Sequence, residues 1–394
     1  MPLRTLSNFI LLPELNLLSI RVFKNKQGFY RCEKVSGFEV CPRCATPSNT
    51  IYDHREVEVK DAPIRGKSVY LKIKKRRFFC KKCKNPFTEP VPGIKKGKRC
   101  TDRFERELLH ACENYQSLSR VRKVFKCSTA YVYKALYHQL ELKRRMNLYP
   151  WPKTIGIDEH KFKRNKQLSI AEFASIIVDY NNKRVMELVE GKTAAGLAND
   201  LAYIPERGNV KNVVLDLCDP FKKFVTEFFP NAQITADKFH VLRLLHPAIN
   251  RERKNITGDR RSLPVRKLLL RNGKNIDWSR KHLLNDWLKQ YPVLNEIYHY
   301  KEALHGLYRI RGYNRASRAL TALTDRMAHS AIKEIKTLRR TLIKWKTQIL
   351  NYFKFGITNG RTEGYNNKCK LVKKNAYGYK SFKNYRLRVL SACR

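Results

Sequence analysis

The chain has 394 residues, of which 82 are Lys or Arg and 34 are Asp or Glu, so its formal net charge is +48. A basic excess of this size indicates a polyanionic partner, because each phosphate that a cation neutralises releases condensed counterions. The basic residues are spread along a chain that is 42% hydrophobic. This excludes a cationic tail and predicts two or three folded domains, although a ribosomal or chromatin protein would also fit the charge.

Membrane and secretion signals are not expected. No apolar run approaches the ~20 residues that a membrane-spanning helix needs. The apolar cluster at 9–12 is followed by Pro13 and Glu14 and by no small-residue cleavage site, so we do not expect a signal peptide. Only four of the eleven cysteines form C-x-x-C pairs, which favours a reducing compartment with a metal site. We therefore expect a cytoplasmic, nucleoid-associated protein.

Residues 1–97 contain both C-x-x-C pairs, and we interpret them as a zinc-binding β module. Four thiolates on two tight turns are a ligand set for a tetrahedral, structural Zn²⁺. Residues 70–79 alternate as a strand would, which predicts a β-hairpin between the pairs. Redox-active or unrelated free cysteines are the alternative, but no thioredoxin-like βαβ pattern surrounds them. The expected ligands are Cys41, Cys44, Cys80 and Cys83.

Residues 98–148 have the pattern of a helix-turn-helix. A helix start at Asp102 precedes an apolar stripe over 118–125, and Ser128 is suited to cap a second helix. An ordinary helical hairpin fits this pattern equally well, and the net charge favours DNA binding. In the DNA-binding interpretation the second helix presents three side chains to a groove. They are Tyr131, Lys134 and His138.

Residues 149–394 predict an α/β domain interrupted by an all-helical insertion at 241–355. The insertion is rich in Leu, Arg and Lys, and it suits a DNA clamp, a protomer contact or a plain helical bundle equally well. The order of elements before it is βββαβαβ, as in a ribonuclease-H-like fold, where the first and fourth strands are neighbours. The strands are expected at 154–157, 173–178, 185–189, 210–215 and 233–236, and the helices at 194–203 and 220–229.

Three carboxylates are candidate catalytic residues. Asp158 and Asp216 each follow an expected strand, and Glu363 is the only acidic residue from Ile335 to the end of the sequence. Two divalent ions held by such groups activate the attacking oxygen and stabilise the leaving one in phosphoryl displacement. Oxygen ligands suit Mg²⁺ or Mn²⁺. The alternative for Glu363 is a favourable charge in a first helical turn.

Other polar residues near these motifs have two interpretations. Asp219 precedes Pro220, which favours a helix cap over a metal ligand. Asp237 and His240 form a second-tier pair that lies near the site, unless Asp237 only caps the next helix. Glu363 begins a helical face that also carries an amide and two cations, so all four side chains can contact one substrate. The other three residues are Asn367, Lys370 and Lys374.

Four segments, in order, resemble bacterial insertion-sequence transposases of the ISL-three family. They are T-I-G-I-D-E-H at 154–160, V-V-L-D-L-C-D-P-F at 213–221, A-D-K-F-H-V at 236–241 and T-N-G-R-T-E-G-Y-N-N-K-C-K at 358–370. The resemblance covers nearly the whole chain, including the zinc motif and the helix-turn-helix. It implies a DDE-type transposase with a ribonuclease-H-like catalytic domain. It also implies a metal-binding triad of Asp158, Asp216 and Glu363.

We therefore expect a multidomain α+β transposase that acts on double-stranded DNA. It would bind terminal inverted repeats and use two Mg²⁺ or Mn²⁺ ions for cleavage and strand transfer, as a homo-oligomer on DNA. A non-catalytic, zinc-containing DNA-binding regulator is one alternative, and an RNA-binding or ribonuclease protein on the same fold is another. Mg²⁺-independent binding without nicking would support the first alternative, and competition between duplex DNA and RNA tests the second.

Overall fold

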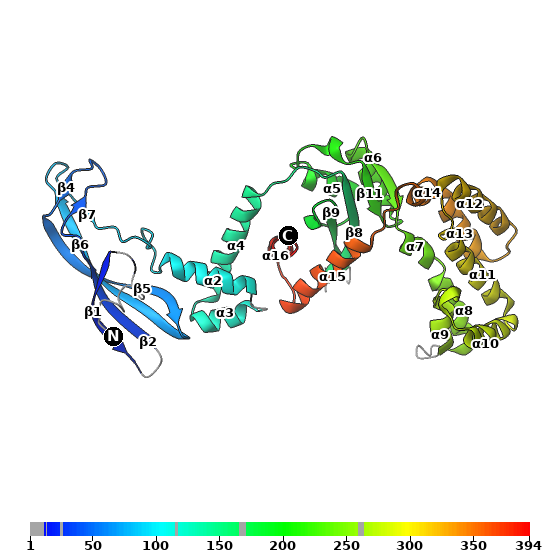
Figure 1. Ribbon diagram of the computed structural model, residues 1–394, viewed down its shortest axis with the longest axis horizontal. Coiled ribbons are helices and arrows are strands. Elements are labelled where there is room, and N and C mark those ends of the chain that lie inside the picture. Colours follow the sequence, from blue (N-terminus) through cyan, green and yellow to red (C-terminus); the bar gives the residue numbers. More distant parts are fainter. Residues whose placement is uncertain (1–11, 13, 24–26, 115–116, 165–170, 259–263) are drawn as a thin grey trace. The chain divides into compact units, whose positions relative to one another are not determined.

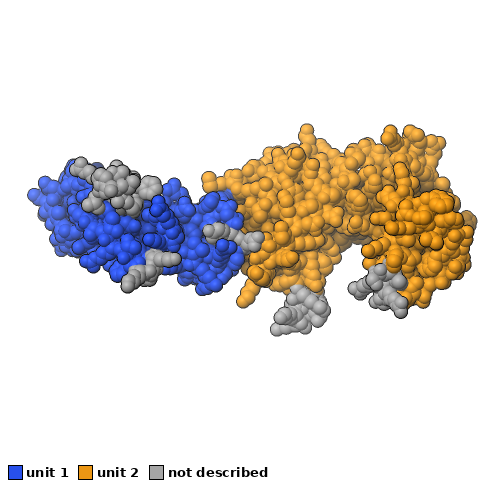
Figure 2. All heavy atoms as spheres, turned by 60° about the horizontal axis from the view of Figure 1, so that its bottom comes forward, with its two compact units in different colours: residues 1–143 blue, residues 144–394 orange. Residues whose placement is uncertain are grey.

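The computed structural model describes residues 12, 14–23, 27–114, 117–164, 171–258 and 264–394. The chain folds into two compact units, residues 1–143 and residues 144–394, which Figure 2 colours separately. The first unit carries both C-x-x-C pairs, and the second carries every candidate carboxylate. None of the described helices is both long and apolar enough to cross a lipid bilayer.

The first unit begins with β-structure. Its strands are β1 (Leu15–Val22), β2 (Gln27–Lys34), β3 (Glu39–Val40), β4 (Pro47–Ser48), β5 (Ile51–Ile64), β6 (Lys67–Cys80) and β7 (Asn85–Thr88). Five of them form one sheet in the order β1-β2-β6-β5, with β7 also paired to β6, while β3 pairs with β4. The antiparallel pair β5 and β6 turns at Arg65 and Gly66, which both have positive φ, as a tight hairpin turn requires. This confirms the hairpin predicted between the cysteine pairs.

Three helices follow, α2 (Asp102–Asn114), α3 (Leu118–Phe125) and α4 (Thr129–Met146). The turn between α3 and α4 is three residues long, and Lys126 in it is left-handed. Val121 and Phe125 of α3 are buried, as are Val132 and Leu136 of α4. The two helices predicted from the apolar spacing are therefore present, with their apolar faces turned inward.

The second unit is built on a five-stranded sheet with the order β10-β9-β8-β11-β12. The strands are β8 (Thr154–Arg164), β9 (Ala171–Asp179), β10 (Arg184–Glu190), β11 (Asn212–Leu215) and β12 (Gln233–Ala236). The helices between them are α5 (Ala194–Leu201) and α6 (Asp219–Phe228), with a short 3₁₀ turn at Arg207–Asn209. Strands β8, β9 and β10 are antiparallel, whereas β11 runs parallel to both β8 and β12. The expected order of elements and the adjacency of the first and fourth strands are confirmed.

Two expected boundaries are wrong. Asp158 does not follow a strand that ends at Ile157, because β8 stays paired with β9 as far as Arg164. Its other partner, β11, ends at Leu215 opposite Ile157, so Asp158 lies where that edge of β8 becomes free. Asp219 is not the helix cap either, because α6 starts at Asp219 itself and Cys218 is the cap residue.

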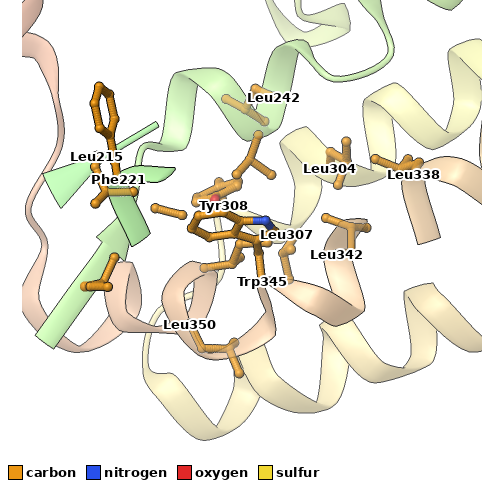
Figure 3. Packing of buried hydrophobic residues seen from close by; sticks show 14 of the residues in the cluster. Leu215, Phe221, Leu242, Leu304, Leu307, Tyr308, Leu338, Leu342, Trp345 and Leu350 are labelled. Carbon is orange, nitrogen blue, oxygen red and sulfur yellow. The ribbon is translucent and has the colours of Figure 1, made fainter. Parts of the chain in front are cut away.

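A series of helices separates β12 from the last two helices of the chain (Figure 1). They are α7 (Lys238–Arg243), α8 (His246–Thr257), α9 (Pro264–Leu270), α10 (Trp278–Lys289), α11 (Pro292–Leu307), α12 (Tyr313–Ala328), α13 (Lys333–Lys344) and α14 (Lys346–Phe355), with a 3₁₀ turn at Gly273–Asn275. Over its described residues the insertion is helical, as predicted. Figure 3 shows that Leu215 and Phe221 of the sheet side share one apolar core with Tyr308, Trp345 and Leu350. The insertion is therefore packed onto the sheet as part of one core.

The last two helices, α15 (Gly360–Asn375) and α16 (Phe382–Ala392), pack on β8, β9 and β10. Tyr385 and Val389 of α16 are buried with Ile176 of β9 in a second apolar cluster. Gly156 of β8 lies under the start of α15, and a Cβ there would be 2.0 Å from Thr362 Oγ1. The absence of a side chain at Gly156 thus lets α15 approach the strand that carries Asp158.

Candidate active site

Three carboxylates stand in a row where the parallel pairing of three neighbouring strands ends. Ile157 of β8 pairs with Leu215 of β11, and Leu215 pairs with Ala236 of β12. An aspartate follows each of these three residues in the chain, so the in-register pairing brings together the carboxylate row. Its members are Asp158, Asp216 and Asp237.

Asp158 and Asp216 in this row repel each other electrostatically. Asp158 is only 9% exposed. Burial, and then the nearby charge of Asp216, raise the pKa of Asp158 to about 6. Two carboxylates forced together in a partly dry site favour a proton or a cation between them. The donor set is mainly oxygen, which fits a hard divalent cation such as Mg²⁺ or Mn²⁺.

His240 contacts two members of the row. Its Nδ1 lies 2.9 Å from Oδ1 of Asp216 and 3.0 Å from Oδ2 of Asp237. One ligand atom from each of these three residues lies within 4.8 Å of the others, as a metal site requires. Hydrogen bonds to Asp216 and Asp237 raise the pKa of His240 to about 10, so a protonated imidazole supplies positive charge there.

Asp237 has both of the roles that the sequence left open. Its side chain caps α7 by accepting a hydrogen bond from the backbone N–H of His240 at 3.1 Å. Its other oxygen accepts from the backbone N–H of Asn359 at 3.0 Å. The same carboxylate therefore orders the start of α7 and the segment before α15, while it lies beside Asp216.

Two asparagines that sequence reasoning missed hold the row in place. Asn366 Nδ2 donates to Asp158 Oδ2 at 2.7 Å and to the carbonyl of Glu159 at 3.1 Å. Asn359 Nδ2 donates to Asp216 Oδ1 at 3.1 Å. Asn366 lies on the buried face of α15 with Thr362 and Cys369, four and three residues away respectively. The helical spacing of Thr362, Asn366 and Cys369 was the sequence feature that could have identified Asn366 as a buried residue.

Glu363 lies in the first turn of α15, three residues before Asn366, and its side chain is exposed. Its backbone N–H donates to the carbonyl of Asn359 at 2.9 Å. Among the described residues, its carboxylate is outside the close group of Asp216, Asp237 and His240. Figure 1 shows α15 alongside β8. The helix thus presents an exposed face near the row, and on that face lie Glu363, Asn367, Lys370 and Lys374.

The four expected zinc ligands in the first unit converge, with their sulfur atoms within 4.8 Å of one another. Cys44 Sγ and Cys80 Sγ are 3.6 Å apart, close to the ~3.8 Å edge of a tetrahedron with Zn–S distances of ~2.3 Å. The two turns repeat one geometry. Ala45 N–H donates to the Cys41 carbonyl and Lys84 N–H to the Cys80 carbonyl, and both donors have φ of 54°. The sulfur positions therefore fit a zinc ion.

The candidate groove-binding residues on α4 differ in their surroundings. Lys134 and His138 are exposed. Tyr131 is half-buried, and its hydroxyl lies 3.1 Å from Cys100 Sγ and 3.2 Å from Glu105 Oε1. Tyr131 thus connects α4 to the start of α2, which leaves its ring less accessible than the two exposed side chains.

Comparisons with known proteins agree with this layout. A family model described as a transposase, of the ISL3 DDE type, matches residues 155–389, which include the carboxylate row and Glu363. A second model, described as the zinc-finger of transposase IS204/IS1001/IS1096/IS1165, matches residues 38–83.

Two relatives are similar over long stretches. The chain is 23% identical over 372 residues to the transposase for insertion sequence element IS1001 of Bordetella parapertussis, with 90% of this chain and 88% of the relative covered. It is 22% identical over 272 residues to the transposase for insertion sequence element IS1557 of Mycobacterium tuberculosis, with 61% and 60% covered.

Proposed function

Because the chain belongs to the ISL3 family of DDE transposases, we propose that it cleaves DNA at the ends of an insertion sequence and joins them to target DNA. The observation that carries the proposal is the carboxylate row, which the parallel pairing of β8, β11 and β12 brings together. The strand order β10-β9-β8-β11-β12, with its antiparallel and parallel halves, supports a ribonuclease-H-like fold for this unit.

We assign the catalytic triad to Asp158, Asp216 and Glu363, with two Mg²⁺ or Mn²⁺ ions as cofactors. When bound, such ions stabilise the charge that develops on the phosphate and lower the pKa of the attacking water. Asp158 and Asp216 lie together on neighbouring strands. Glu363 is the ligand that α15 would add, because this helix packs on β8 through Asn366.

The remaining residues of the site position these groups and hold protons. Asn366 and Asn359 donate to Asp158 and Asp216, which fixes the direction of their carboxylate oxygens. Protonated His240 balances the charge of Asp216 and Asp237 before a cation arrives. Asp237 and His240 are thereby second-tier groups that act on the metal ligands.

DNA binding is assigned to surfaces in both units. The exposed cations Lys370 and Lys374 follow Glu363 on one face of α15, where they suit phosphates next to the reacting bond. In the first unit, α3 and α4 suit a helix-turn-helix that would present Lys134 and His138 to the terminal inverted repeats. A structural Zn²⁺ at the four cysteines would hold the β module, and the protein would act on nucleoid DNA as a homo-oligomer.

The test is strand cleavage of a labelled duplex that carries the element's own end, with Mg²⁺ or Mn²⁺. We expect cleavage by the wild type and none by Asp158→Asn, Asp216→Asn or Glu363→Gln, while all variants still bind the duplex. Glu227→Gln is the matched control, because Glu227 is an exposed acid on α6 beside Lys223. Cleavage retained by all three site variants would reject the assignment.

A further inference from the structure

A hollow of about 440 Å³ lies between α7 and the C-terminal ends of α9 and α11. One wall comes from α7 and includes Lys238, Phe239 and Arg243, and the other comes from residues 270–275 and 305–309. Lys238 and Phe239 are also the two residues between Asp237 and His240 in the chain. The hollow therefore starts where the carboxylate row ends, in a part of the molecule that the proposed chemistry does not use.

The lining of the hollow is cationic. It contains Lys238, Arg243 and Arg309 and no acidic residue, and none of these three cations forms an ion pair among the described residues. Burial, followed by neighbouring cations, lowers the pKa of His246 to about 4, so its imidazole is neutral at pH 7. The hollow thus offers net positive charge to an anion.

A buried hydroxyl in the wall lacks a partner. Tyr308 is 6% exposed, and its hydroxyl has no hydrogen-bond partner in the part of the chain that the structure describes. The Nε2 atom of His305, on the same wall, is also buried without one. Figure 3 shows Tyr308 among apolar side chains. Buried polar groups are normally satisfied, so these two atoms indicate a ligand that can exchange hydrogen bonds with them.

The other side chains suit a flat, partly apolar group. Phe239 is 42% exposed on α7, and the guanidinium of Arg243 lies 6.0 Å from its ring centroid. Asn275 brings an amide to the opposite wall, where the amide of Asn272 contacts Arg309 at 3.0 Å and His305 at 3.3 Å. An aromatic face stacks on a nucleobase, amides read base edges, and Lys and Arg contact phosphate. A nucleotide combines all three features, and it fits the hollow's volume.

We propose that this hollow binds one unpaired nucleotide of the DNA strand that is being processed. Its phosphate meets the cations, and its base lies against Phe239 and faces the Tyr308 hydroxyl. The inference rests on the proposed function, since the carboxylate row would act on a phosphodiester close to this nucleotide. The hollow would then recognise a duplex end that is distorted or opened.

The experiment compares two duplexes in the presence of EDTA, so that no cleavage occurs. One carries a single 2-aminopurine opposite an abasic position, and the other has the same 2-aminopurine paired with thymine. We expect the full-length protein to bind the first about tenfold more tightly, since stacking and phosphate contacts are gained only with an unpaired base. A dye placed far from the 2-aminopurine reports binding by anisotropy.

Substitutions test whether the preference for an unpaired base arises from the hollow. Phe239→Ala and Arg309→Ala should reduce it to about twofold or less, and Tyr308→Phe should weaken it while the ring stays in the core. Trp278→Ala and Arg280→Ala are the matched controls, because both residues are exposed on α10 outside the hollow. Thermal melting of each variant confirms that it is folded. Added dAMP should compete with the unpaired duplex better than inorganic phosphate does.

Equal binding of both duplexes by the wild type would overturn the proposal. So would a preference that survives the Phe239 and Arg309 substitutions, or equal competition by phosphate and dAMP, which would mean an anion site alone. Cleavage of element ends in Mg²⁺ is measured separately. If the protein cleaves element ends but shows no preference for the unpaired base, only the nucleotide site is rejected. If it shows the preference but does not cleave, only the proposed function is rejected.

Discussion

Asn366 Nδ2 lies 2.7 Å from Oδ2 of Asp158, a contact that joins α15 to β8 across 208 residues of sequence. The same amide donates to the backbone carbonyl of Glu159 at 3.1 Å. This pair of hydrogen bonds holds the carboxylate that burial and Asp216 make reluctant to ionise. Asn366 therefore links the helix that carries Glu363 to the carboxylate row.

The first prediction concerns this link. Asn366→Ala should reduce the affinity of the site for Mn²⁺ by about 10- to 100-fold, because this is the usual effect of removing a group that orients a metal ligand. Asn367→Ala should change it little, because Asn367 is exposed on the face of α15 that carries Glu363, and it is Asn366 that donates to Asp158. Isothermal titration of Mn²⁺ into both variants measures the difference. Equal effects of the two substitutions would show that the amide contact with Asp158 does not order the site.

The second prediction concerns the approach of α15 to β8. In Gly156→Ala the new methyl group would lie 2.0 Å from Thr362 Oγ1 and 2.6 Å from the ring of Tyr180. Overpacking of this kind costs about 1–3 kcal/mol, and a displaced α15 should also abolish cleavage. Urea unfolding and the cleavage assay test the two effects.

A glycine on α15 supplies the control. A Cβ at Gly364 would meet nothing within 4 Å, and the residue is helical. Gly364→Ala should therefore raise stability by about 0.5–1 kcal/mol through helix propensity. Destabilisation of similar size by both substitutions would mean that the tight contact at Gly156 is not the cause.

Much of the sheet was predictable because its strands are short apolar runs bounded by turn residues, as at 185–189 and 233–236. The position of Asp158 inside β8 was not, because the length of a strand depends on which partner continues beside it. That Asn366, and not the predicted Asn367, contacts Asp158 has a similar origin. A helical face can be drawn through either residue, and only packing on β8 decides which one is buried.

Asp237 shows a different limit of sequence reasoning. The sequence pattern predicts either a helix cap or a carboxylate near the candidate site, and one side chain occupies both positions. One oxygen accepts from His240 N–H and the other from Asn359 N–H. Local capping is visible in sequence because its donor is three residues away. The register that places Asp237 beside Asp216 depends on strand pairing between β11 and β12.

The third prediction is a pH dependence of stability in the metal-free protein. His240 has its pKa raised to about 10 by Asp216 and Asp237, against ~6.5 in the unfolded chain. Its contribution is therefore fully present below about pH 6.5 and is lost as the pH rises through about 10. The side chain is 49% exposed. After discounting for solvent screening, we expect the protonated imidazole to add about 1–2 kcal/mol to the free energy of unfolding.

His240→Gln isolates this contribution. The difference in unfolding free energy between the wild type and this variant should be largest near pH 6 and should shrink towards pH 10, as followed by urea unfolding in EDTA. A difference that stays constant over this range would show that the imidazole is not charged between the two carboxylates. Saturating Mg²⁺ should reduce the difference at every pH, because the cation then supplies the charge.

The fourth prediction concerns the cysteine cluster of the first unit. Purified protein should contain about one Zn²⁺ per chain, since four thiolates complete a structural site. Cys80→Ser should lower the zinc content and unfold the turns at both pairs, because Cys80 is buried beside Cys44. Cys127→Ser is the control, as Cys127 is half-buried on the turn before α4 and outside the cluster.

Elemental analysis gives the zinc content, and duplex binding reports the consequence for DNA. We expect Cys80→Ser to weaken binding of element ends while the second unit keeps its own melting transition, because the carboxylate row lies entirely within residues 144–394. Zinc bound at full occupancy by Cys80→Ser, or lost equally from Cys127→Ser, would show that the four sulfur atoms are not the ligands. A chelator should reproduce the effect in the wild type, since metal binding and folding are coupled in such modules.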